Sequence, residues 1–243
     1  MKKIIVFILC LNLISCSSND CFDEGTIQQK EINVPFFDKI TVGNEVTLIL
    51  KQGITQQVII ETGANLWEEI TYKVEDNQFY ISDKNTCNLS RDYAITKVYI
   101  TSPNIEKIRS DTAREILSDG VLNYPNLTIY SENYHEDTLT NADINLQVNC
   151  INLNIVANGS SVFTIKGASQ YLGITFASGS SRFNGNELLV NNIVLSQKST
   201  NDMLIHPITS LTGHLFSIGN VISYNNPIST NITEHYTGKL IFN

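Results

Sequence analysis

The hexapeptide Asn158-Gly159-Ser160-Ser161-Val162-Phe163 recurs 20 residues later as Ser178-Gly179-Ser180-Ser181-Arg182-Phe183. The same spacing leads next to Lys198-Ser199-Thr200 and then to Ile218-Gly219-Asn220. Four small residues therefore stand in register: Gly159, Gly179, Ser199 and Gly219. A short apolar run, such as Ile151–Ile155 or Leu172–Phe176, precedes each of them. A repeat near 20 residues, with short strands separated by small residues, is typical of proteins that stack one coil per repeat.

The physics of such a stack explains the recurring small residues. Inward apolar side chains of one coil lie on those of the next, and a large side chain at a sharp corner would collide with the neighbouring coil. We therefore predict an all-β fold, a parallel β-helix or β-solenoid with coils of roughly 20 residues. Its corners are expected at Gly159, Gly179, Ser199 and Gly219. A β-sandwich is the alternative, since sandwiches also show turn signals at regular spacing.

The earlier part of the chain also predicts strands. Runs such as Val46–Leu50 and Lys97–Ile100 alternate apolar and polar residues and are bounded by turn formers. Asp76-Asn77 predicts a hairpin turn between the runs Tyr72–Val74 and Phe79–Ile81. We expect a single β-solenoid domain over residues 31–243, with a less regular part at 31–118 and regular coils at 119–243.

The N-terminus has the features of an export signal. Lys2 and Lys3 precede an apolar run over residues 4–11, which is shorter than the about 20 residues that a membrane span needs. Leu13-Ile14-Ser15-Cys16 resembles the bacterial lipobox, whose cysteine is acylated and becomes the new N-terminus. We predict a signal peptide at 1–15, lipidation of Cys16 and a polar lipidated tether at 16–30. The protein is expected to be an exported outer-membrane lipoprotein, with the periplasmic and the surface face both left open.

The charge balance bears on the partners. The chain has 16 basic and 24 acidic residues, a net charge of −8, and no run of Lys and Arg. Phosphate binding needs clustered cations, so nucleic acid is not expected as a partner, nor is electrostatic docking on anionic lipid. The lipid on Cys16 supplies the membrane contact instead. The other partner is expected to be an envelope or extracellular ligand, with a glycan as one candidate class.

The remaining cysteines fit an oxidising compartment. Cys10 is lost with the signal, which leaves Cys21, Cys87 and Cys150 beside the lipid site. Such a compartment permits one disulfide among them, and we favour Cys21–Cys87. Cys150 lies in an alternating apolar stretch and is typical of a buried strand cysteine. Zinc is the alternative, but the chain has no Cys-x-x-Cys pair. We predict no metal and no cofactor.

The sequence has no recognisable catalytic set. His206, His214 and His235 are scattered, and the repeated positions carry Ser, Thr and Asn, with Asp202 as the single acid among them. Such residues suit hydrogen bonding better than proton transfer, which needs paired carboxylates or a carboxylate with a base. We predict a non-enzymatic protein. Because some β-helix proteins cleave polysaccharides, a polysaccharide-binding or polysaccharide-processing protein is the alternative.

The order of several short segments carries a family resemblance. These segments are Phe37–Val42, Val46–Gly53, Thr62–Leu66, Val74–Ile81, Val98–Pro103 and the Gly-Ser repeats. Together, over about residues 36–243, the chain resembles the putative auto-transporter adhesin, head GIN domain family, which is common in lipoproteins of Bacteroidota. The resemblance implies a β-helical fold and an adhesive role, and it brings no catalytic residues.

Two tripeptides resemble the O-glycosylation sequon of Bacteroidota, in which Asp precedes Ser or Thr and a small or apolar residue follows. They are Asp111-Thr112-Ala113 and Asp137-Thr138-Leu139. Thr112 and Thr138 are therefore candidate glycosylation sites.

Overall fold

The structure is a computed structural model that describes residues 23–85, 95–133 and 139–243. The predictions for the signal peptide 1–15 and for Cys16, Cys21, Cys87 and Thr138 lie outside these residues.

The described residues form one continuous sheet of 17 strands. The strands are β1 (Ile27–Ile32), β2 (Lys39–Val42), β3 (Thr47–Gln52), β4 (Gln57–Gly63), β5 (Ile70–Glu75), β6 (Gln78–Asp83), β7 (Lys97–Ser102), β8 (Lys107–Ser110), β9 (Ile116–Leu122), β10 (Asn126–Ser131), β11 (Asp143–Ala157), β12 (Val162–Phe176), β13 (Arg182–Gln197), β14 (Met203–Leu215), β15 (Val221–Ser223), β16 (Ser229–Glu234) and β17 (Leu240–Phe242).

The prediction of an all-β protein is confirmed. Within the described ranges the one helical element is a 3-10 turn, η2 (Trp67–Glu69). None of the described segments forms a helix of the length and apolar character that crossing a bilayer requires.

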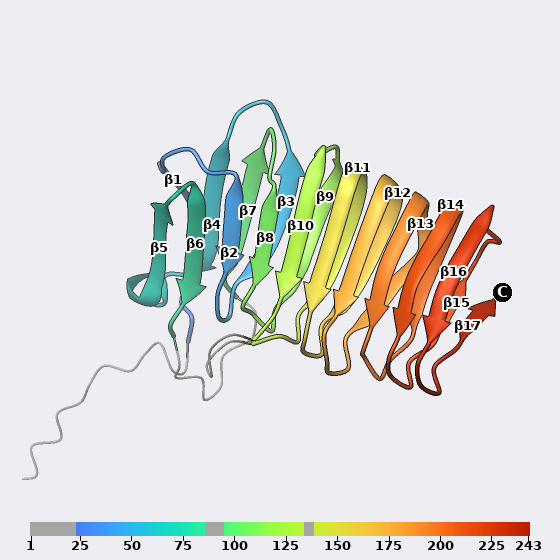
Figure 1. Ribbon diagram of the computed structural model, residues 1–243. Helices are drawn as coiled ribbons and strands as arrows, with labels where there is room; N and C mark the ends of the chain where they lie inside the picture. The colour runs from blue at the N-terminus through green and yellow to red at the C-terminus, as the bar shows by residue number, and fades with distance from the viewer. Residues whose placement is uncertain (1–22, 86–94, 134–138) are drawn as a thin grey trace, which may run out of the picture.

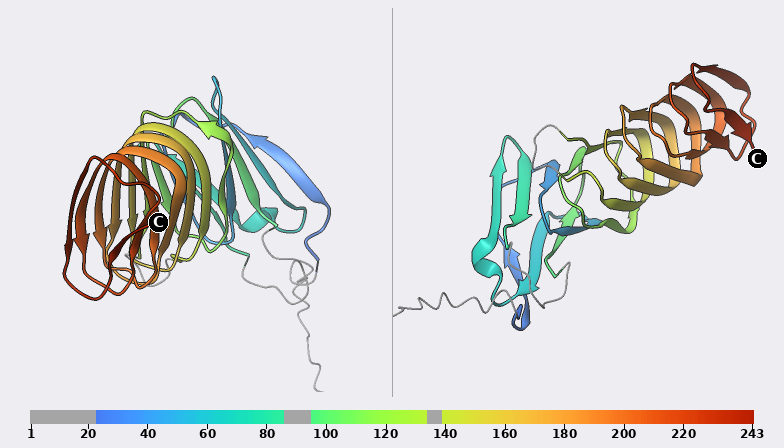
Figure 2. Two further views of the ribbon diagram at one scale, coloured as in Figure 1. Left: turned by 90° about the vertical axis from the view of Figure 1, so that its right-hand side faces the viewer. Right: turned by 90° about the horizontal axis from the view of Figure 1, so that it is seen from below.

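The sheet curls so that its strands lie in two rows on opposite sides of one core (Figures 1 and 2). One row, here called the β5–β16 row, runs β5-β6-β2-β8-β10, continues through the C-terminal halves of β11 to β14, and ends at β16. The other runs β1-β4-β7-β3-β9, continues through the N-terminal halves of β11 to β14, and ends at β15 and β17. Each of the long strands β11 to β14 thus bends midway and serves both rows.

The C-terminal half is regular because each long strand from β11 to β14 pairs in parallel with the one before in a similar register. Phe163 pairs with Phe183, and Phe183 pairs with Met203, each 20 residues further along the chain in parallel strands. All three side chains, like Ile144 and Val221 on either side of them, are 0% exposed. Burying an apolar side chain of this size contributes roughly 1.5–3 kcal/mol, so this stacked interior stabilises each long strand against its neighbours.

The N-terminal half adds antiparallel pairs to the parallel ones. β5 and β6 form the predicted hairpin, and its two turn residues Asp76 and Asn77 have φ values of 52° and 57°. Both signs suit a type I′ turn, which matches the twist of the two strands. β4 pairs antiparallel with β1 on one side and β7 on the other. This hairpin lies at the far end of the β5–β16 row from the C-terminus (Figure 1).

Candidate functional site

The four corner residues lie at the successive turns that follow the long strands β11, β12, β13 and β14, where one backbone approaches the next. A β-carbon on Gly159 would stand 2.0 Å from Thr140 Oγ1, and one on Gly219 would stand 2.2 Å from the Asn201 carbonyl oxygen. Ser199 is fully buried, and its hydroxyl donates to the Ser181 carbonyl at 2.6 Å. These positions build the fold, and none of these contacts leaves a group aimed at a ligand.

Two further residues singled out in the sequence are enclosed by the protein. Cys150 on β11 is a buried free cysteine, and burial raises the pKa of its thiol to about 11. Thr112 is 0% exposed, and its hydroxyl donates to the Val46 carbonyl at 3.3 Å and accepts from the Arg114 N–H at 3.0 Å. Thr112 lies in the bend between β8 and β9 with its hydroxyl enclosed, so a transferase could reach it in the folded protein only if this bend opened. Glycosylation of Thr112 stays a prediction from the sequence.

Asp202 and His206, two of the polar residues considered above, contact the backbone of neighbouring segments. Asp202 accepts a hydrogen bond from the Asn220 N–H at 2.8 Å, which joins two consecutive turns. His206 lies with Nδ1 3.1 Å from the Asn186 carbonyl. The partner in each of these contacts is a backbone group and not a second titratable side chain of the kind that acid–base catalysis uses.

The fold brings together two histidines that look unrelated in the sequence. His214 Nδ1 lies 3.1 Å from His235 Nε2. The Phe216 ring stacks on the His235 ring with 4.4 Å between centroids and 5° between planes. The Lys198 ammonium lies 5.3 Å from the centre of the Phe216 ring. The period near 20 residues was the signal that could have placed His214 beside His235, since they are 21 residues apart.

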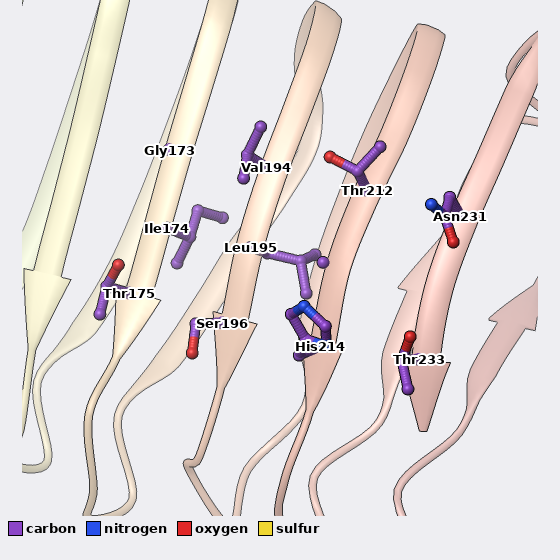
Figure 3. A pocket seen from close by; sticks show the side chains of 11 residues that line it. Gly173, Ile174, Thr175, Val194, Leu195, Ser196, Thr212, His214, Asn231 and Thr233 are labelled. Carbon is purple, nitrogen blue, oxygen red and sulfur yellow. The ribbon is translucent and has the colours of Figure 1, made fainter. Parts of the chain in front are cut away.

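A shallow groove runs beside this ring cluster, on the outer side of the β5–β16 row (Figure 3). It has a volume of about 410 Å³ and crosses β12, β13, β14 and β16. Its polar lining consists of hydroxyl, amide and imidazole groups, from Thr175, Ser196, Thr212, His214, Asn231 and Thr233. Val194, 61% exposed, gives it an apolar centre.

The groove is suited to hydrogen bonding with a neutral ligand. No carboxylate or ammonium group is among its lining residues, and the imidazole of His214 is its one side chain of an acid–base type. An acid–base pair of the kind that cleaves glycosidic bonds would need two carboxylates facing one space. Across the part of the chain that the structure describes, three or more His, Cys, Asp or Glu side chains nowhere gather as they would around a metal ion.

The comparison with known families places the chain. The sequence profile described as putative auto-transporter adhesin, head GIN domain, matches residues 36–227. No curated protein matches the chain in sequence.

Solved structures share the fold at low identity. A putative adhesin from Bacteroides fragilis superimposes with a TM-score of 0.79 at 19% identity, covering 90% of this chain and 97% of that one. A putative lipid binding protein from Parabacteroides distasonis gives 0.61 at 13% identity, covering 90% and 97%. A putative adhesin from Parabacteroides merdae gives 0.56 at 14% identity, again covering 90% and 97%.

Proposed function

The chain belongs to the putative auto-transporter adhesin, head GIN domain family, and from this premise we propose that it is a non-enzymatic, lipid-anchored cell-envelope protein that acts as an adhesin or structural binding module. Its body is a parallel β-solenoid in this proposal. The parallel register of β11 to β14, in which each coil repeats the one before, supports the solenoid part of the proposal.

The observation that carries the binding role is the groove across β12, β13, β14 and β16. It offers hydroxyl and amide groups in rows, because consecutive coils place equivalent residues side by side, as Thr175, Ser196 and His214 are. Such a surface recognises by hydrogen bonding and shape and lacks a pair of groups for chemistry on the ligand.

The anchor rests on the sequence signal at Cys16 and on the family. Residues 27–30 of the predicted tether belong to strand β1, so the polar stretch before the folded body ends at about residue 26. An acylated cysteine followed by this shorter stretch would hold the body close to the outer membrane. Replacing Cys16 by Ala should abolish acylation and release the protein from the membrane fraction. Incorporation of labelled fatty acid measures the first effect, and cell fractionation measures the second.

Protease treatment of intact cells tests the adhesive role. Digestion of the protein on live cells, together with weaker attachment of cells that lack it, is the expected result. If the protein is protected from protease on cells with an intact outer membrane, the adhesive role is rejected, because a periplasmic protein does not meet a surface ligand.

The neutral character of the groove favours one alternative, a polysaccharide-binding or polysaccharide-processing protein. Binding to a panel of glycans tests the first form. Release of oligosaccharides from any of them would establish the second and contradict the non-enzymatic proposal.

A further inference from the structure

Five basic side chains gather on the outer side of the β5–β16 row, at its N-terminal end. They are Lys39, Lys73, Lys84, Lys107 and Arg109. The register explains the gathering: Thr41 of β2 pairs with Tyr80 of β6 and with Arg109 of β8, and Tyr80 pairs with Lys73 of β5. The sequence shows no basic cluster because these residues come from β2, β5, β8 and the residue after β6, which meet only in the fold.

Not all of these cations are neutralised locally. Lys73 pairs with Glu75, Arg109 lies 3.0 Å from Asp111, and Lys39 lies 3.9 Å from Asp38. Lys84 and Lys107 have no carboxylate within ion-pair distance in the described parts of the chain. Lys84 and Lys107 thus place two ammonium groups on one face with no ion-pair partner among the described residues, in a protein whose net charge is −8.

Two tyrosine rings accompany the cations. Lys73 lies 5.1 Å from the centre of the Tyr80 ring, and Lys107 lies 5.4 Å from that of Tyr130. Tyr130 pairs with Arg109, so Tyr80 and Tyr130 occupy one ladder that runs from β6 through β2 and β8 to β10. Three strand spacings separate the two rings, a distance of about 14 Å.

A groove with a volume of about 320 Å³ lies at the first of these rings. Thr41, Thr71 and Ser82 supply hydroxyl groups to its lining, and Lys73 and Lys84 supply ammonium groups. Gly43 lies in its floor, where a β-carbon would stand 2.8 Å from that of Ser82. The site therefore combines a concave surface, an aromatic ring and two cations.

We propose that this basic-aromatic face, formed by Lys73, Tyr80, Lys84, Lys107 and Tyr130, binds an acidic polysaccharide whose sugars carry carboxylate groups. Ammonium groups form charge-assisted hydrogen bonds with carboxylates, and an aromatic face packs against the apolar face of a sugar ring. Two cation–tyrosine units about 14 Å apart can engage separate sugars of one chain. The proposal rests on the proposed binding function and specifies the ligand class.

The layout of the β5–β16 row favours a polymer over a single sugar. The ladder of Tyr80 and Tyr130 continues through Val156 to Thr175 and Ser196, which line the neutral groove. A polysaccharide could follow this row across both grooves. Nucleic acid fits less well, because closely spaced phosphates are bound by clusters of cations. Three of the five cations on this face, Lys39, Lys73 and Arg109, already lie beside carboxylates.

The proposal is tested with the chain from residue 16 onward, in which Cys16→Ser removes the lipid site and keeps the protein in solution. Its binding to polygalacturonate, alginate and hyaluronan is measured. At least one of these should bind, and methyl-esterified polygalacturonate, which keeps the sugar backbone and loses the charge, should bind at least about fivefold more weakly. The double variant Lys84→Gln/Lys107→Gln should weaken acidic polymer binding by about fivefold. The matched control Lys51→Gln/Lys166→Gln removes the same charge from exposed lysines elsewhere and should leave affinity unchanged.

The ring is tested by Tyr80→Leu, which should weaken binding, against Tyr80→Phe, which should keep it. Equal loss in the two double variants, equal binding of the esterified polymer, or no binding to any of the three acidic polymers would overturn the proposal. So would single-stranded DNA displacing the polysaccharide at lower concentration. If none of the three acidic polymers binds while cells still attach through the protein, the ligand class is wrong and the adhesive function stands.

Discussion

The backbone of Gly179 lies directly against that of Gly159, so that a β-carbon on Gly179 would stand 2.2 Å from the Gly159 carbonyl oxygen. Gly179 also has a φ of +81°. The close approach of Gly159 and the positive φ therefore both require glycine at position 179. The Ser180 N–H donates to the same carbonyl at 2.8 Å, which fixes the distance between the two turns.

Replacing Gly179 by Ala should destabilise the protein by about 3 kcal/mol, since the methyl group adds overlap with Gly159 to the strain of a positive φ. Gly120→Ala is the matched control. Gly120 has a φ of +88° and no atom within 4 Å of a built β-carbon, so strain alone applies and the loss should be about 1 kcal/mol. Urea unfolding of both variants measures the difference, and equal losses would contradict the close approach of the two turns.

Phe183 provides a second test of the stack. It lies between Phe163 and Met203 and is 0% exposed. Phe183→Ala should lower the free energy of unfolding by about 3–5 kcal/mol, because it leaves a cavity in the middle of the column. Arg182→Ala, at the exposed position next to it, should change stability by less than about 0.5 kcal/mol. A small effect at Phe183 would mean that β12, β13 and β14 do not pack in this register.

The regular half of the fold could be predicted because its contacts repeat in the sequence. Gly159 and Gly179 carry the same constraint one period apart, and Phe163 and Phe183 fill the same column. The order β5-β6-β2-β8 could not be predicted in this way. These strands have no common period, and β2 lies between β6 and β8 only because the intervening chain leaves the row to form strands of the other row.

The same reason explains what was missed at the candidate site. Lys84 and Lys107 are 23 residues apart, outside the repeat, and nothing in the sequence indicates that they share a face. The contact of His214 with His235 was accessible in principle from the period. The sequence did not indicate this contact, because neither histidine matches the Gly and Ser pattern by which the repeat is recognised.

Cys150 should be nearly inert in the native protein. The thiolate is the reactive form, and burial raises the pKa of this thiol to about 11, so both access and ionisation are low near neutral pH. Labelling with a thiol reagent should be slow in the folded chain and complete in urea. Rapid labelling of Cys150 without denaturant, located by mass spectrometry of the modified peptide, would contradict its burial.

The disulfide between Cys21 and Cys87 remains a prediction from the sequence, and the same labelling experiment tests it. In the chain with Cys16→Ser, a Cys21–Cys87 bond leaves no readily labelled thiol until a reductant is added, whereas free thiols at these positions would react at once. Peptide mapping without reduction should then recover the two cysteines as one linked peptide. Recovery of Cys150 in a linked peptide would reject this pairing.

The carboxylate of Glu61 should make stability depend on acid pH. Burial alone would raise its pKa, but hydrogen bonds from Gln29 at 2.5 Å and Lys97 at 3.1 Å outweigh burial and hold the pKa below its ordinary value of 4.5. A group with a lower pKa in the folded state stabilises the protein above its unfolded pKa, and this contribution is lost as pH falls through the folded pKa. The contribution should be less than about 1 kcal/mol because solvent reaches the cluster.

Glu61→Gln should therefore reduce the stability lost between about pH 6 and about pH 3, as measured by urea unfolding at each pH. Glu31→Gln removes one carboxylate from neighbouring β1 without touching Lys97, and serves as the control for the change in net charge. If the two variants follow the same pH dependence, the cluster around Glu61 does not join β4 to β1 and β7 electrostatically. A larger pH dependence in Glu61→Gln than in the unmodified protein would reverse the sign of the argument and place the pKa of Glu61 above its ordinary value.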